Sequence, residues 1–284
     1  MHPDAALRAL AAVAGVRGAG EILSISPDGR IVAAFGELVV KQGLPGEAER
    51  TAATMAAVAD ALGPDAPLVL PALRWRRGDA LGLERLRGAG YCRLAAEEEG
   101  PLALAAAGRA VAALHAIHAA PLPAAHLDAH VHELIRPHPM AIGLALPDLA
   151  GRIEAVMTEI SARAASPRAG LVPCVVHRDL HLGQLFATTD GRVALIDWDL
   201  AALGDAALDL GNFRAYIATR LPGRAERLWD SFVAGYGALP GLVGGYEALM
   251  LVRMAAKAHR LGGAAAAKQV EALVAAAERT LIAE

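Results

Sequence analysis

The chain has 284 residues, 55% hydrophobic and 20% charged, so it can bury a large core and is not expected to be disordered. A formal net charge of -3 provides no global positive field, and we expect neither nucleic acid nor a membrane as a partner. Residues 1–10 lack the pattern of a secretory signal, and the most apolar stretch, 101–120, is interrupted by arginine and histidine. With only two cysteines, Cys92 and Cys174, these features predict a cytoplasmic protein.

The N-terminal elements predict a helix followed by a small sheet. Residues 3–16 are Ala-rich and helical in pattern, and three apolar runs follow at 21–26, 30–35 and 38–42. The short linkers between these runs contain Pro, Asp and Gly in turn positions. We therefore expect a three-stranded antiparallel meander.

A second helix and two more strands are expected next. Residues 46–62 predict a helix, because Glu47 and Glu49 favour its first turn and a Gly-Pro pair follows its last residue. Apolar runs at 68–70 and 81–86 read as strands four and five of the same lobe.

The pattern beyond residue 86 is mainly helical. The expected elements are helices at 102–118 and 146–165, strands at 174–176 and 193–196, and helix from Asp209 onward. A Pro- and His-rich connector covers 119–139. The sequence thus predicts an α+β fold with a small antiparallel-sheet N-lobe, residues 1–86, and a larger helical C-lobe, residues 87–284.

The chemical signal of the chain lies between His177 and Asp199. Phosphoryl transfer to a hydroxyl requires a carboxylate for the acceptor oxygen, and a magnesium ion held by a second carboxylate and an amide oxygen. Asp179 lies five residues before Gln184, which places both on one loop. Asp197 ends the following strand and is expected to reach the same metal ion.

This segment resembles the catalytic centre of the aminoglycoside phosphotransferase-like kinases. That superfamily has the two-lobed protein-kinase-like fold and includes choline, homoserine, fructosamine and maltose kinases. The resemblance implies that Asp179 is the catalytic base and that Gln184 and Asp197 are magnesium ligands. It also implies that His177 and His181 support the loop.

The resemblance is dense from Val175 to Phe213. The run from Gly204 to Leu210 is similar to the family's Gly-Asp-Pro-x-x-Asp-Leu element, whose last acid, here Asp209, braces the catalytic loop. Two positions depart from the family pattern. Gln184 stands where Asn is usual, and Arg178 stands where Gly is usual.

The N-lobe carries the other residues that the resemblance implies for nucleotide binding. Lys41 ends the third expected strand, where a kinase lysine holds the α- and β-phosphates. Glu49 is the expected partner of this lysine, with Glu47 as the alternative, because one sequence does not fix the phase of the helix. The backbone from Glu84 to Leu86, at the junction of the lobes, is expected to pair with adenine.

Three residues are candidates for the acceptor pocket: Asp199, Trp229 and Tyr236. The two aromatic residues share a helical face, which is more typical of core packing than of substrate stacking.

Basic residues outnumber acidic residues after Gly211, and Arg253, Lys257 and Arg260 form a stripe at helical spacing. Such a stripe is usually a solvated helix face. Because a polycationic aminoglycoside prefers an acidic pocket, the excess of basic residues disfavours aminoglycoside resistance as the function.

The resulting prediction is an ATP- and Mg²⁺-dependent kinase whose acceptor is a hydroxyl of a sugar, amino sugar, amino alcohol or aminoglycoside-like molecule. The sequence carries no signal for an oligomeric state. A protein kinase is disfavoured, because Trp198-Asp199 follows Asp197 and Gly204 comes too soon to leave an activation loop. The alternative from another class is a nucleotide-binding pseudokinase or adaptor without catalysis.

Overall fold

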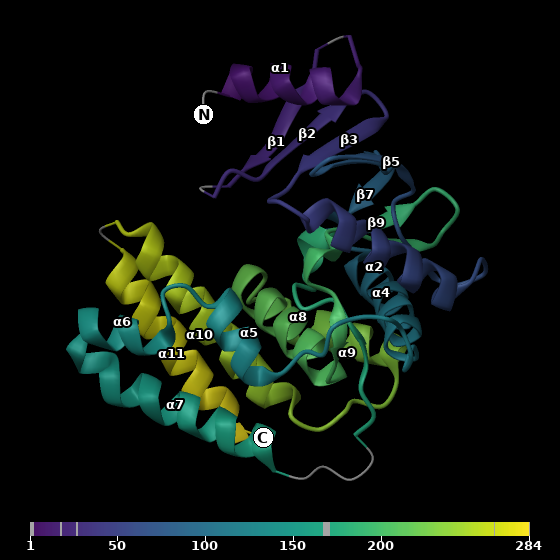
Figure 1. The fold of residues 1–284 in the computed structure, drawn as a ribbon. Helices are drawn as coiled ribbons and strands as arrows, with labels where there is room; N and C mark the ends of the chain where they lie inside the picture. Colours follow the sequence, from purple (N-terminus) through teal and green to yellow (C-terminus); the bar gives the residue numbers. More distant parts are fainter. Residues whose placement is uncertain (1–2, 18, 27, 167–170, 264, 284) are drawn as a thin grey trace.

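The structure is a computed structural model that describes residues 3–17, 19–26, 28–166, 171–263 and 265–283. Figure 1 shows a small N-terminal part, built on an antiparallel sheet, beside a larger and mostly helical C-terminal part. The predicted α+β class is confirmed. None of the described helices combines the length and the apolar character that crossing a bilayer requires.

The N-terminal sheet has the strand order β1-β2-β3-β6-β5, with every neighbouring pair antiparallel. Its strands are β1 (Glu21–Ile25), β2 (Ile31–Phe35), β3 (Leu38–Gln42), β5 (Leu73–Arg77) and β6 (Ala80–Glu84). The first three form the predicted meander. Helix α1 (Pro3–Ala14) packs on this sheet, because Ala6, Leu10 and Ala14 recur at helical spacing and are buried with Phe35 and Val40.

One predicted strand belongs to a different sheet. The run 68–70 was expected in the N-lobe, but β4 (Leu68–Val69) pairs in parallel with β10 (Val193–Leu195). It lies in a four-stranded sheet of order β4-β10-β9-β7. The fifth strand of the N-terminal sheet is instead β5, an edge strand whose residues are mostly exposed. An exposed edge strand needs no apolar run, so the sequence pattern did not indicate it.

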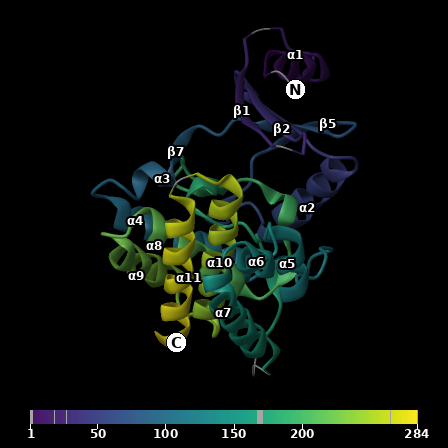
Figure 2. The same ribbon diagram turned by 90° about the vertical axis from the view of Figure 1, so that its left-hand side faces the viewer.

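The C-terminal part is built on a bundle of helices around one large core. Its helices are α3 (Tyr91–Leu94), α4 (Gly100–His115), α5 (Leu127–Leu134), α6 (Pro139–Ala145), α7 (Pro147–Ala165), α8 (Ala206–Arg220), α9 (Ala225–Tyr236), α10 (Val243–Leu261) and α11 (Ala266–Ala283). Its short elements are β7 (Gly88–Gly90), β8 (Cys174–Val176), 3₁₀ helix η1 (Leu182–Gln184), β9 (Leu185–Thr188), β10, 3₁₀ helix η2 (Trp198–Leu200) and β11 (Ala202–Gly204). Figure 2 shows α10 and α11 side by side below the N-terminal sheet, and α10 also packs on α8.

The predicted helices at 102–118 and 146–165 correspond to α4 and α7, and the predicted strands at 174–176 and 193–196 correspond to β8 and β10. The helix that was predicted at 46–62 is α2 (Glu47–Leu62). The connector at 119–139 contains α5 and the start of α6, which are too short to show a clear helical period.

Helices α4 and α9 approach closely through two glycines. A Cβ atom on Gly108 would lie 2.1 Å from the carbonyl oxygen of Phe232, and one on Gly235 would lie 2.0 Å from that of Ala105. Only glycine permits such backbone proximity. The contact brings the ends of the two helices together, so that His115 meets Tyr236.

Candidate active site

The candidate catalytic loop, residues 177–184, follows β8 and is held by one buried carboxylate. Asp209 lies in the first turn of α8 and is fully buried. Its Oδ2 accepts a hydrogen bond from the backbone N–H of His177 at 2.6 Å, and its Oδ1 accepts one from Arg178 at 2.7 Å. Asp209 therefore fixes the backbone immediately before Asp179, which is the bracing role that the family resemblance implies.

A histidine and a tyrosine support this carboxylate from α4 and α9. His115 Nε2 lies 3.2 Å from Asp209 Oδ2, and His115 Nδ1 lies 3.0 Å from the hydroxyl of Tyr236. Burial raises the pKa of the Asp209 carboxyl, but the hydrogen bond and charge of His115, together with His177, outweigh burial and leave this pKa below its usual range. Asp209 is therefore ionised at neutral pH.

Arg178 occupies a left-handed backbone conformation with φ 67°. This conformation costs a non-glycine residue roughly 1–2 kcal/mol, which explains why glycine is usual at this position in the family that the sequence resembles. In this chain the Arg178 side chain is buried, and its Nη2 donates to Glu133 Oε2 on α5 at 3.0 Å. The ion pair fastens α5 to the catalytic loop.

Asp179 has both carboxylate oxygens turned toward nitrogen donors. Oδ1 lies 3.1 Å from Arg253 Nη2, on α10. Oδ2 lies 3.5 Å from Gln184 Nε2 and 3.9 Å from His181 Nε2, which are longer contacts. Oδ2 is therefore the oxygen that an incoming hydroxyl can engage most easily.

His181 is positioned by its neighbours on the loop and on α8. Its Nδ1 accepts the backbone N–H of Gly183 at 3.0 Å, so Nε2 carries the proton and faces Asp179. The ring stacks on Tyr216 with centroids 4.3 Å apart. Burial lowers the pKa of His181, which favours the neutral ring at pH 7.

Asp197 stands at the end of β10 in a left-handed conformation with φ 70°. Its Oδ2 lies 3.4 Å from Gln184 Nε2, and its Oδ1 pairs with Lys41 Nζ. His177 supports the same turn, because its Nε2 donates to the carbonyl oxygen of Ile196 at 2.9 Å. The structure therefore brings together Asp179, Gln184, Asp197 and Lys41.

The predicted pairing of Lys41 with Glu49 is absent from this structure. Lys41 Nζ pairs with Asp197 and Asp199, while Glu49 is exposed on α2. The alternative partner, Glu47, instead pairs with Arg30 and accepts the backbone N–H of Leu44. The phase of α2 accounts for this difference, since it turns both acidic residues of the first turn away from the lysine.

Asp199, predicted as an acceptor-pocket residue, contacts Lys41 and Thr51 in this structure, and its role in an acceptor pocket stays a prediction. Its Oδ1 accepts a hydrogen bond from the hydroxyl of Thr51 on α2 at 2.9 Å, and its Oδ2 pairs with Lys41. Burial lowers the pKa of Lys41, but the charges of Asp197 and Asp199 outweigh burial and raise this pKa above its usual range. Lys41 therefore remains a cation.

The donor set around Asp197 fits a magnesium ion. Asp197 and Gln184 offer a carboxylate and an amide, and Mg²⁺ is usually held by one or two carboxylates together with substrate phosphates. Half a turn of the Gln184 amide places Oε1 where Nε2 now faces Asp197. Within the described ranges, no cluster of three or more His, Cys, Asp or Glu side chains suits a metal ion. A site here therefore depends on the glutamine amide and on the phosphates of a nucleotide.

The backbone predicted to pair with adenine is partly engaged already. The N–H of Glu84 donates to the carbonyl oxygen of Ala72 at 2.9 Å, and that of Arg85 donates to Glu37 at 2.8 Å. These bonds occupy the N–H groups of Glu84 and Arg85 but leave the N–H of Leu86 for a contact between this backbone and adenine. That contact stays a prediction.

Of the two aromatic acceptor candidates, Trp229 lies in the core and Tyr236 is half-buried against it. Trp229 is buried and stacks on Phe232 with centroids 5.5 Å apart, and the Arg214 guanidinium lies over its ring. Tyr236 is engaged with His115 through its hydroxyl. Both side chains therefore make packing or hydrogen-bond contacts within the protein. These contacts agree with core packing, the more typical role of aromatic residues on one helical face.

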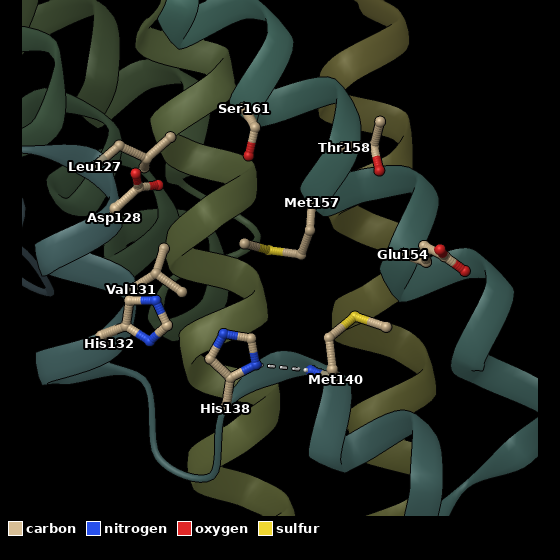
Figure 3. A pocket seen from close by; sticks show the side chains of 10 residues that line it. All are labelled: Leu127, Asp128, Val131, His132, His138, Met140, Glu154, Met157, Thr158 and Ser161. Atoms are coloured by element: carbon tan, nitrogen blue, oxygen red, sulfur yellow. Dashed lines mark hydrogen bonds between the residues drawn. The ribbon is translucent and has the colours of Figure 1, made fainter.

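A pocket of about 440 Å³ lies apart from the catalytic residues, between α5, α6 and α7. Figure 3 shows its lining, in which His132 and His138 face each other at one end; their rings stack with centroids 5.3 Å apart. Met140 and Met157 supply apolar surface, and Glu154 supplies charge. The pocket contains none of the predicted site residues.

Sequence reasoning missed several residues that contact the site residues or the loop that carries them, among them Thr51, His115, Glu133 and Arg253. Two of them carried a usable signal. His115 is a polar residue at the end of an apolar helical run, and Arg253 belongs to the basic stripe. Nothing local distinguishes Thr51 or Glu133 from ordinary helix residues.

Comparisons with known proteins identify relatives by sequence. The profile of the Phosphotransferase enzyme family matches residues 30–252. An uncharacterized protein from Deinococcus radiodurans is 35% identical over 92 residues, a match that spans 32% of this chain and 27% of that relative's length.

Solved structures share the fold at low identity. A choline/ethanolamine kinase family protein from Mesorhizobium loti is 18% identical with a TM-score of 0.67, over 99% of this chain and 95% of that one. A choline kinase from Streptococcus pneumoniae is 12% identical with a TM-score of 0.64, over the full length of both chains. A spectinomycin phosphotransferase, in complex with ADP and spectinomycin, is 12% identical with a TM-score of 0.64, over 99% and 98%.

These structures show that the fold is that of known small-molecule kinases. The family match covers residues 30–252 and so includes Lys41, the catalytic loop and Asp209. On that match, this chain belongs to the Phosphotransferase enzyme family.

Proposed function

We propose that this protein is a kinase that transfers the γ-phosphate of ATP to a hydroxyl of a small molecule. The observation that carries the proposal is the convergence of Asp179, Gln184, Asp197 and Lys41 from three separate segments of the chain. Membership of the phosphotransferase family supports the reaction class. The ADP bound in the spectinomycin phosphotransferase supports a nucleotide as the donor.

The acceptor hydroxyl donates a hydrogen bond to Asp179, most readily at Oδ2, which carries the longer contacts. The hydroxyl oxygen forms a bond to the γ-phosphorus, and the bond from that phosphorus to the bridging oxygen of ADP breaks. Asp179 takes the hydroxyl proton and later releases it to solvent, so the step balances. Lys41 offers its positive charge to the phosphates of the nucleotide.

A magnesium ion, when bound, supplies positive charge to the phosphate oxygens, and Asp197 with Gln184 would hold it. We propose that the nucleotide lies between an N-lobe of residues 1–86 and a C-lobe of residues 87–284, with adenine near Leu86. The acceptor classes to be tested are sugars, amino sugars, amino alcohols and aminoglycoside-like hydroxyl compounds, and we propose that the reaction takes place in the cytoplasm.

The direct test is a screen of ADP formation from Mg·ATP across these acceptor classes, with the phosphorylated product identified by mass spectrometry. Acceptor-dependent ADP formation supports the proposal. Binding of ATP without turnover on any acceptor class would instead support a pseudokinase.

The metal assignment predicts the behaviour of an Asp197→Ala variant. Removal of this carboxylate should weaken binding of Mg·ATP as well as catalysis, because the metal charge loses its anchor on the protein. Calorimetric titration of ATP at increasing magnesium concentration measures the effect. An unchanged magnesium dependence would place the metal elsewhere.

Gln184 allows a sharper test, because one substitution of it keeps an amide oxygen and another removes that oxygen. Gln184→Asn keeps an amide oxygen on a shorter stem and should retain much of the activity. Gln184→Leu has a similar volume but no lone pair, so turnover should fall and the magnesium requirement should rise. Rates measured against magnesium concentration compare the two variants. Near-native curves for the leucine variant would show that Gln184 is not a ligand.

A further inference from the structure

The basic stripe on α10 divides into one residue at the active site and two at the surface. Arg253 Nη2 lies 3.1 Å from Oδ1 of Asp179, and 22% of the Arg253 side chain is exposed. Lys257 and Arg260, one and two turns further along, are exposed. Of the three residues in the stripe, Arg253 is therefore the one that places a positive charge next to the Asp179 carboxylate.

The Arg253 guanidinium is incompletely satisfied by the protein. Nη1 is buried and has no hydrogen-bond partner among the described residues. A buried donor without an acceptor is destabilising, and an acceptor atom of a bound ligand would remove that penalty. A guanidinium presents a planar set of donors that matches the oxygens of a carboxylate or a phosphate.

The acids that contact Arg253 and Arg178 are engaged by these arginines. Asp179 pairs with Arg253, and Glu133 pairs with Arg178. His130 on α5 is buried, and burial together with the two arginines lowers its pKa to about 3, so it carries no charge at neutral pH.

No open aromatic cage lies beside the carboxylate in the described part of the chain. Recognition of quaternary ammonium groups uses exposed aromatic faces. Tyr216, the aromatic ring close to the loop, stacks on His181 and lies beneath the Arg220 guanidinium. Trp229 is buried. Among the described residues, the carboxylate near Asp179, Asp197, is paired with Lys41, and the aromatic ring near the loop has no open face.

We propose that Arg253 is a specificity-determining residue that selects an acceptor with a carboxylate or phosphate group close to the reacting hydroxyl and disfavours a cationic acceptor. This inference rests on the proposed kinase function. The anionic group binds the Arg253 guanidinium, and the hydroxyl of the same molecule occupies Oδ2 of Asp179.

The test uses the full chain with Mg·ATP at constant ionic strength and a matched set of hydroxyl compounds. Glycerate, glycerol and 3-amino-1,2-propanediol differ in one terminal group, which is anionic, neutral or cationic. Glycerol 3-phosphate distinguishes a phosphate from a carboxylate. We expect kcat/KM to fall from the anionic to the cationic probe by about tenfold or more, since like charges in contact cost several kcal/mol.

Substitutions of Arg253 separate specificity from positioning. Arg253→Gln should reduce the preference for the anionic probe by about tenfold or more, mainly through KM, and Arg253→Lys should restore part of it. Arg260→Gln removes the same charge from the same helix, away from Asp179, and should leave the preference unchanged. A wild-type preference for 3-amino-1,2-propanediol, or an equal loss for all probes in Arg253→Gln, would overturn the inference.

A binding measurement keeps this result separate from the proposed reaction. Calorimetric titration of glycerate and of 3-amino-1,2-propanediol into the protein with ADP and Mg²⁺ measures charge preference without turnover. Absence of ADP formation with preferential glycerate binding would count against the kinase but support the role of Arg253. ADP formation with tighter binding of the cationic probe would support the kinase function but contradict the role of Arg253.

Discussion

Asp179→Asn should lower the rate of phosphoryl transfer by about 10²- to 10⁴-fold while leaving the affinity for ATP nearly unchanged. The asparagine keeps the shape of the side chain but does not take up the proton of the acceptor hydroxyl. The affinity is expected to persist because Lys41, Asp197 and Gln184 remain in place. Single-turnover transfer and calorimetric ATP binding, measured on the same preparation, test the two halves of this expectation.

Asp190→Asn is the matched control for this variant. Asp190 lies in the exposed turn between β9 and β10, where it pairs with Arg192. The same chemical change at this site should leave transfer within about twofold of wild type, because surface ion pairs contribute little. Turnover of Asp179→Asn equal to that of the control would remove Asp179 from the catalytic role.

Asp209→Ala should destabilise the protein by about 3 kcal/mol or more, because each buried donor left without an acceptor costs about 1–3 kcal/mol. Three donors lose their acceptor at once: the backbone N–H groups of His177 and Arg178, and the His115 ring. Asp209→Asn retains one acceptor oxygen, so its free energy of unfolding should lie between those of wild type and Asp209→Ala. Urea denaturation measures the free energy of unfolding, and a loss below about 1 kcal/mol for the alanine variant would contradict this role.

The stability difference between wild type and Asp209→Asn should depend on pH. Because the folded-state pKa of Asp209 lies below its usual value, the carboxylate contributes stability that is present above the unfolded pKa, about 4. That contribution is lost as pH falls through the folded pKa. The gap between the two proteins should therefore be full at pH 7 and shrink in acid below about pH 4. A gap that stayed constant into strong acid would show that the carboxylate charge is not what stabilises the loop.

The spatial proximity of the proposed catalytic residues could be predicted because these residues are close in the sequence. Asp179 and Gln184 share one loop. Asp197 follows the short strand β10, and Asp209 lies in the first turn of α8. Local backbone geometry determines where residues at loop, strand-end and helix-start positions lie. The chemistry of phosphoryl transfer restricts which side chains can act at these positions. The meander of β1 to β3 was predictable for a similar reason, since turn residues and apolar runs act over a few positions.

The pairing of β4 and the partner of Lys41 depended on contacts between distant segments. The run at 68–70 reads as a strand, but its sequence does not say that β10, more than a hundred residues later, is its neighbour. Likewise, the acids of α2 lie at plausible spacing for Lys41, yet packing sets the phase of that helix and leaves Glu47 facing Arg30.

The sequence by itself indicated the family to which this protein belongs, because the residue types and spacing around Asp179 are dense enough to carry that resemblance, and the family match over residues 30–252 confirms it. The tertiary structure alone decided what surrounds that carboxylate. Arg253 is 74 positions away and reads as part of a solvated stripe, but the packing of α10 against α8 places it on Asp179. Helix-to-helix packing depends on side chains from the whole core, so no local pattern encodes which face of α10 meets the catalytic loop.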